Sequence, residues 1–209
     1  MVNIHDFQDD EMPEDIWVEI FKKQKLLADK YKDIEKMGTL LETTKLNVDT
    51  AVGQRFIKDF AWRVTEELTE AIEARVESNA QAEVGEDGLR DEAYLHFQEE
   101  LIDALHFLTE LTIIAGYDET IIPVFFEINE NEDWHLVVYY LGLMCNCLKN
   151  KPWKQTQMLT DREKFENYLK NTWEAMIFTM RKSGMDLEAI YQMYFKKNMV
   201  NRFRQRSKY

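Results

Sequence analysis

Two stretches of this chain, Val64-Thr-Glu-Glu-Leu-Thr-Glu-Ala71 and Phe97-Gln-Glu-Glu-Leu-Ile-Asp-Ala104, carry the same pattern of two acidic residues three positions apart. The acidic pairs are, in chain order, Glu67, Glu70, Glu100 and Asp103. Residues at this spacing project from the same side of an α-helix. Two such helices packed face to face would gather four carboxylates, an arrangement that needs a cation among them. Carboxylate oxygens select Mg²⁺ or Mn²⁺, so the pattern predicts a divalent metal site.

One carboxylate of each pair falls in the apolar sector of its helix when residues are placed at about 100° intervals. Glu67 shares its sector with Phe60 and Val64, and Glu100 shares its sector with Ala104 and Phe107. The second member of each pair lies at the border of the sector. A carboxylate that faces a core needs a partner. On the first helix, Arg63 could pair with the inward carboxylate in place of a metal. Acidic pairs also occur on solvated helix faces, so the prediction depends on the repetition of the pattern on two helices.

The composition favours a single all-α domain over residues 1–209, arranged as a multi-helix bundle. Only 7 Gly and 3 Pro occur in 209 residues, and 45% of the residues are hydrophobic. The net charge of −13 argues against nucleic-acid binding. No apolar run is long enough for a membrane span and the N-terminal residues do not resemble a secretory signal, so we expect a cytoplasmic protein.

Hydrophobic periodicity and helix-breaking residues divide the chain into a series of helices. The first begins near Pro13 and breaks at Gly38, and the polar, glycine-containing residues 78–92 predict a loop. A short helix is expected near Pro123, and Asp161 is a candidate N-cap. The other helices are expected at about 50–78, 91–115, 132–150, 162–182 and 186–204.

Three features leave alternatives open. Residues 196–209 hold six Lys or Arg and no acid, which fits a phosphate clamp, a solvated tail or a helix end that complements the macrodipole. The apolar side chains of 132–150 and 173–178 suit either a dimer interface or core packing. Cys145 and Cys147 point apart on a helix and lack a nearby His, so we expect structural thiols without a metal.

The acidic pairs and their separation resemble the all-α NTP pyrophosphohydrolases, which include dimeric dUTPases, MazG-type enzymes and dCTP pyrophosphatases. Three stretches are similar to the dimeric dUTPase branch in particular. Its E-x-x-D-x-x-H-F pattern matches Glu100 to Phe107, and its K-N-x-x-N-x-F-R-Q-x-x-G-Y pattern matches Lys197 to Tyr209. Its Q-x-x-L-N segment, which contacts uracil, resembles the residues that end at Asn47.

The resemblance implies a bundle with a four-helix catalytic core, in a homodimeric enzyme that hydrolyses dUTP to dUMP. It also makes dUDP a further candidate substrate. The four acidic residues would hold two or three Mg²⁺ ions, and Glu67 would accept a proton from the attacking water. Lys197 and Arg204 would neutralise phosphate charge. The remaining substrate contacts implied by the resemblance are Asn47, His106, Phe107, Asn198, Asn201 and Tyr209. For His106 a supporting role behind the site, and for Phe107 ordinary core packing, are the alternatives.

The chain departs from the family pattern at several positions. Thr43 stands where the family has Gln, residues 74–80 lack the Trp of cellular members, and Lys208 replaces the penultimate Gly. The short chain resembles a phage-type member. These departures keep two other functions open: hydrolysis of another nucleotide, such as dCTP or a modified dNTP, and a non-catalytic helical dimer that acts through protein interaction.

Overall fold

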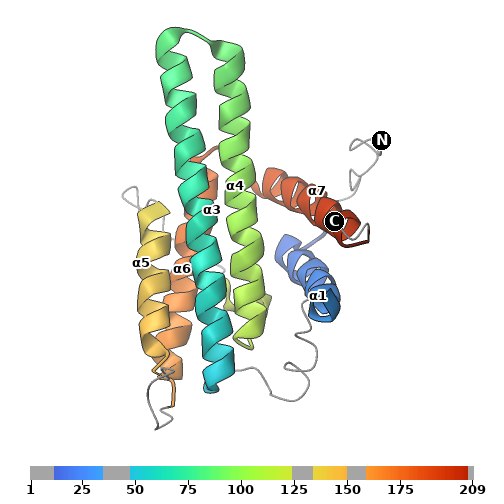
Figure 1. Ribbon diagram of the computed structural model, residues 1–209, viewed down its shortest axis with the longest axis vertical. Helices are drawn as coiled ribbons and strands as arrows, with labels where there is room; N and C mark the ends of the chain where they lie inside the picture. The colour runs from blue at the N-terminus through green and yellow to red at the C-terminus, as the bar shows by residue number, and fades with distance from the viewer. Residues whose placement is uncertain (1–11, 35–47, 124–133, 150–158, 207–209) are drawn as a thin grey trace.

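The protein is described by a computed structural model over residues 12–34, 48–123, 134–149 and 159–206 (Figure 1). Within these ranges it forms α-helices and one short 3-10 helix, with no strand, which confirms the predicted all-α class. The elements are α1 (Ile16–Ile34), α3 (Ala51–Val84), α4 (Asp87–Ile114), η2 (Glu119–Ile121), α5 (Trp134–Cys147), α6 (Arg162–Lys182) and α7 (Leu187–Arg206).

Helices α3 and α4 form a long antiparallel hairpin that runs through the centre of the molecule and projects beyond the other helices (Figure 1). The predicted loop over 78–92 is wrong, because α3 continues to Val84 and α4 begins at Asp87. Gly85 makes this tight connection with φ of 77°, a left-handed conformation that glycine adopts without steric cost. The hydroxyl of Ser78 donates a hydrogen bond to the carbonyl oxygen of Arg90 and ties the two helices together.

The other helices cover two sides of this hairpin. Helices α5 and α6 pack against each other and lie along α3 and α4, completing a four-helix bundle, whereas α1 and α7 pack together against α4 (Figure 1). Trp173 of α6 lies at the junction, fully buried, and its indole nitrogen donates to the hydroxyl of Thr112 on α4 at 3.0 Å. The rings of Trp17 and Phe21 from α1 pack within 6 Å of the same indole.

The predicted helix boundaries are mostly close to the observed ones. Asp161 caps α6 as expected, accepting a hydrogen bond from the backbone of Lys164, and Thr50 caps α3 in the same way. The short helix expected near Pro123 is η2, which ends before the proline. In the part of the chain that is described, no helix combines the length and apolar character needed to cross a membrane.

The segment 173–178 belongs to the core. Trp173, Met176 and Ile177 are buried against the rest of the molecule, so core packing accounts for their apolar character. Neither cysteine forms a disulfide; Cys147 is buried and Cys145 is half-buried. The burial of Cys147 favours a structural role for that residue.

Candidate functional site

The two acidic motifs meet between α3 and α4. Carboxylate oxygens of Glu67, Glu100 and Asp103 all lie within 4.8 Å of one another. Glu100 is buried, while Glu67 and Asp103 are half-buried. Glu70 is exposed and lies outside this group of three, although its charge still raises the pKa of Glu67. Helix periodicity therefore brings three of the four predicted acidic residues together and leaves Glu70 at the edge.

The electrostatics of this acidic cluster, defined as Glu67, Glu100 and Asp103, are unfavourable without a cation. Burial, a hydrogen bond to Glu100 and the charges of its acidic neighbours raise the pKa of Glu67 to about 8. Burial likewise raises the pKa values of Glu100 and Asp103. Glu67 therefore keeps a proton that it donates to Glu100, since two charged carboxylates at hydrogen-bond distance repel each other strongly.

Three basic side chains lie near the cluster. The ammonium group of Lys197, from α7, forms an ion pair with the carboxylate of Asp103. The imidazole of His96 lies 3.2 Å from Glu100, one helical turn away on α4. The charge of Arg204 on α7 also lowers the pKa of Asp103. The basic C-terminal helix thus faces the acidic cluster.

The donor set fits a hard divalent cation. Three carboxylates converge within the spacing that one ion or a closely spaced pair of ions can bridge, and oxygen ligands of this kind suit Mg²⁺ and Mn²⁺. Replacing the shared proton by a metal ion would relieve the repulsion that raises the pKa of Glu67. Arg63, the predicted rival partner of Glu67, instead pairs with Asp59 at 3.3 Å.

Phe107 lies one turn beyond Asp103 on α4 and is half-buried. Its ring packs edge-on against Phe60 of α3, with 6.1 Å between centroids. The guanidinium of Arg63 lies over both rings, at 5.2 Å from the centroid of Phe60 and 5.7 Å from that of Phe107. This aromatic and cationic surface is formed by α3 and α4, the two helices that carry the acidic cluster.

Two residues predicted to contact substrate lie in the interior. His106 is 5% exposed, and its ring stacks on that of Tyr194 with 3.8 Å between centroids. Asn198 is 1% exposed, and its side-chain amide donates to the carbonyl oxygen of Lys23 on α1 at 3.5 Å. For His106 these contacts favour the alternative of a supporting role behind the site.

The other predicted residues lie on α7 or outside the described ranges. Asn201 is half-buried one turn after Lys197, and Arg204 follows on the same face of the helix at an exposed position. Asn47 and Tyr209 lie outside the residues that the structure describes. The prediction that they contact substrate therefore stays a prediction.

Sequence reasoning missed His96 and Gln24. The spacing of His96 four residues before Glu100 was a usable signal, because such residues face each other on a helix. Gln24 accepts hydrogen bonds from His106 and Tyr194, two residues far away along the chain. No local pattern could have indicated this contact.

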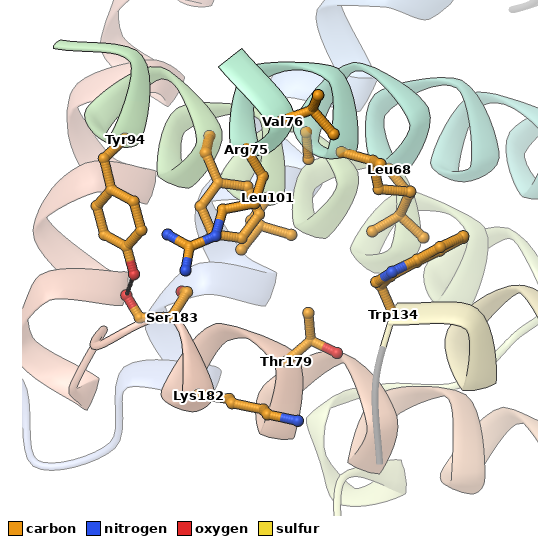
Figure 2. A pocket seen from close by; sticks show the side chains of 12 residues that line it. Leu68, Arg75, Val76, Tyr94, Leu101, Trp134, Thr179, Lys182 and Ser183 are labelled. Carbon is orange, nitrogen blue, oxygen red and sulfur yellow. Dashed lines mark hydrogen bonds between the residues drawn. The ribbon is translucent and has the colours of Figure 1, made fainter. Parts of the chain in front are cut away.

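A separate pocket of about 260 Å³ lies between the α3–α4 hairpin and the α5–α6 pair (Figure 2). The guanidinium of Arg75 lies over the ring of Tyr94, 4.6 Å from the ring centroid, and the Tyr94 hydroxyl donates a hydrogen bond to the carbonyl oxygen of Ser183. Trp134 and Lys182 line the opposite wall (Figure 2). None of the candidate site residues that the structure describes lines this pocket, so it is distinct from the acidic cluster.

Comparison with protein families matches residues 90–209 to a family model described as dUTPase. The matched region contains Glu100 and Asp103 and the whole of α7, but not Glu67 or Glu70. The first acidic motif lies outside the matched region, and its link to the second motif is the position of Glu67 beside Glu100 and Asp103 in the structure. Searches of the curated proteins and of the solved structures gave no match.

Proposed function

The chain belongs to the dUTPase family, and is therefore a nucleotide pyrophosphohydrolase; we propose that it hydrolyses dUTP to dUMP and pyrophosphate in a Mg²⁺-dependent reaction. One observation carries the proposal. The acidic residues of the family-matched helix α4 meet Glu67 of α3 on one side and Lys197 of α7 on the other. A metal site and a phosphate-binding cation are thereby adjacent.

The carboxylates of Glu67, Glu100 and Asp103 would hold Mg²⁺, with Glu70 joining them from the exposed edge. The bound metal would supply Lewis-acid chemistry, polarising phosphate oxygens and lowering the pKa of the attacking water. Glu67 is the candidate proton acceptor, because its carboxylate lies in the cluster and its surroundings raise its pKa, to about 8 in the metal-free protein, which supports the uptake of a proton. We propose two or three ions, as in the resemblance, and Mn²⁺ as a substitute.

Helix α7 would bind the phosphate chain. Lys197 is anchored at Asp103, and Arg204 lies about two turns further along the same face. An Arg can bind phosphate through two parallel hydrogen bonds, whereas Lys contributes a point charge. Of the three interpretations of the basic C-terminal segment, the ion pair of Lys197 supports the clamp.

Phe107 and Asn201 are the described candidates for contacts with the deoxyribose and base. The Phe107 ring lies one helical turn beyond Asp103 on α4 and packs against Phe60, and its apolar face would disfavour a 2′-hydroxyl. Asn47 and Tyr209 complete the proposed substrate contacts. The substitution of the family Gln by Thr43 motivates hydrolysis of another dNTP as the second candidate.

The test is a panel of dNTPs, dUDP and NTPs incubated with Mg²⁺, with and without EDTA. The proposal predicts selective, EDTA-sensitive release of pyrophosphate from dUTP. Faster cleavage of another nucleotide would mean that this nucleotide, and not dUTP, is the substrate, and would leave the proposed metal site unchanged. A homodimer and a cytoplasmic location remain predictions, and light scattering of the purified protein tests the first of them.

A further inference from the structure

A network of hydrogen bonds connects α1, α4 and α7 behind the acidic cluster. The side chain of Gln24, 2% exposed, lies at its centre. Its oxygen accepts hydrogen bonds from the Tyr194 hydroxyl at 2.6 Å and from Nδ1 of His106 at 2.9 Å. Its nitrogen donates to the carboxylate of Glu110 at 2.7 Å.

The partners fix the orientation of every group in this network. The Glu110 carboxylate accepts hydrogen bonds, so the amide nitrogen of Gln24 must face it and the amide oxygen must face the other two residues. Because this oxygen only accepts, His106 must carry its proton on Nδ1. Its Nε2 is buried with no hydrogen-bond partner among the described residues. The hydrogen bond to Gln24 and the stacking on Tyr194 hold the ring in place.

The network lies one helical turn from the ion pair on both helices. His106 follows Asp103 by three positions on α4, and Tyr194 precedes Lys197 by three positions on α7. Gln24 thus couples the two helices directly behind the point where Lys197 contacts Asp103. A rotation or slide of α7 that broke the network would move Lys197 with it, because side chains on one helix share its backbone frame.

We infer that Gln24 is a positioning residue that, through His106 and Tyr194, holds α7 in the register that places Lys197 at Asp103. This inference rests on the proposed function for its catalytic consequence, but not for its structural content. A buried polar group left without its partner costs about 1–3 kcal/mol, so arrangements that break the three hydrogen bonds of Gln24 are disfavoured.

The decisive substitution is Gln24→Glu, which preserves the shape and the two acceptor contacts but places a carboxylate against Glu110. The matched rescue is Gln24→Glu combined with Glu110→Gln, which restores a donor and an acceptor with their positions exchanged. Tyr194→Phe is a second variant, since it removes one hydrogen bond and retains the stacked ring. Circular dichroism confirms that each variant is folded before it is compared.

The first readout is the labelling rate of individual lysine amines by an N-hydroxysuccinimide ester, measured by mass spectrometry. We expect Gln24→Glu and Tyr194→Phe to raise the rate at Lys197 several-fold, because the amine is released from Asp103, and the double variant to restore it. Lys170, paired with Glu166 on α6, is the internal reference and should not change. An unchanged labelling rate at Lys197 in both folded single variants overturns the inference, whichever nucleotide the enzyme hydrolyses.

The second readout is steady-state hydrolysis of dUTP. Misplacing a phosphate-binding cation should raise KM by about tenfold and change kcat by less than about threefold. In a Lys197→Met background the same Gln24→Glu substitution should raise KM much less, whereas a merely structural role would give equal effects in both backgrounds. A labelling response without any dUTP turnover would support the positioning role and contradict the proposed substrate.

Discussion

Lys197 on α7 forms an ion pair with Asp103 on α4, and this contact joins the basic C-terminal helix to the acidic cluster. Asp103 is simultaneously a member of the carboxylate group that includes Glu67 and Glu100. A positive side chain therefore occupies one edge of the site at which a divalent cation is proposed to bind. The two cations compete for the same carboxylate, and several properties of the protein follow from that competition.

Lys197→Met should strengthen metal binding to the protein without nucleotide. The ammonium group neutralises part of the negative charge that attracts a cation, so its removal should tighten Mn²⁺ binding by about threefold to tenfold, allowing for solvent screening at this partly exposed pair. Calorimetric titration with Mn²⁺ measures the change. Lys170→Met, which removes a comparable ion pair on α6, is the matched control and should leave Mn²⁺ affinity unchanged. Weaker binding in Lys197→Met would contradict the competition.

Glu67→Gln should abolish most turnover while the protein stays folded. The variant loses a charged metal ligand and the proposed proton acceptor, and losing several kcal/mol of stabilisation corresponds to a rate decrease of at least about a hundredfold. Its neighbour Glu66 is exposed on the same helix and points away from the cluster, so Glu66→Gln is the matched control. Steady-state rates with saturating Mg²⁺ compare the turnover of the two variants. Comparable rates for the two variants would remove Glu67 from the active site.

Glu70→Gln should have a smaller effect than Glu67→Gln on metal affinity in the absence of nucleotide. Glu70 is exposed and lies outside the group of three converging carboxylates, so its side chain must reorient to become a ligand. If it completes the site only when the triphosphate is bound, the substitution should reduce turnover more than it weakens Mn²⁺ binding. Parallel calorimetry and kinetics test this difference. Equal losses of Mn²⁺ affinity in the two variants would make Glu70 a full ligand of the resting site.

The metal-free protein should become less stable as the pH rises. In the folded state the pKa of Glu67 is about 8, whereas the ordinary value of 4.5 applies to the unfolded chain. Between these values the folded state binds the extra proton, so the free energy of unfolding falls with increasing pH. Urea denaturation between about pH 5 and pH 8 should show this trend in EDTA, and Glu67→Gln should flatten it. Stability that rises over the same range would contradict the protonated pair.

The convergence of the acidic residues could be predicted from the sequence because it depends on local geometry. Spacing of three residues and the positions of Phe60, Val64 and Phe107 determine which way each carboxylate points on its helix. Two long helices of this kind pack through their apolar faces, so the inward-facing Glu67 and Glu100 must approach each other. The helix angle did not separate Glu70 from Asp103, since both lie at the border of the apolar sector but Asp103 alone joins the cluster.

The long hairpin and the interior network could not be predicted in this way. The polar residues near 78–92 lie on helices that project beyond the bundle, where exposed side chains give no apolar periodicity. Ser78 is buried, and its hydroxyl donates a hydrogen bond to the carbonyl oxygen of Arg90 on the opposite helix. The position of His106 likewise depends on Gln24 and Tyr194, which reach it through tertiary packing that sequence spacing does not encode.

The connection between α3 and α4 offers a direct test of this hairpin. Gly85→Ala should destabilise the protein by about 1 kcal/mol, because the left-handed backbone at φ of 77° disfavours a side chain even though the space around it is open. Gly88→Ala, three residues later within α4, has equally open surroundings and no positive φ, so alanine should stabilise the helix by about 0.5 kcal/mol. Thermal denaturation of both variants shows whether each substitution lowers or raises the stability of the protein. If residues 78–92 were a flexible loop, the two substitutions would have similar, small effects.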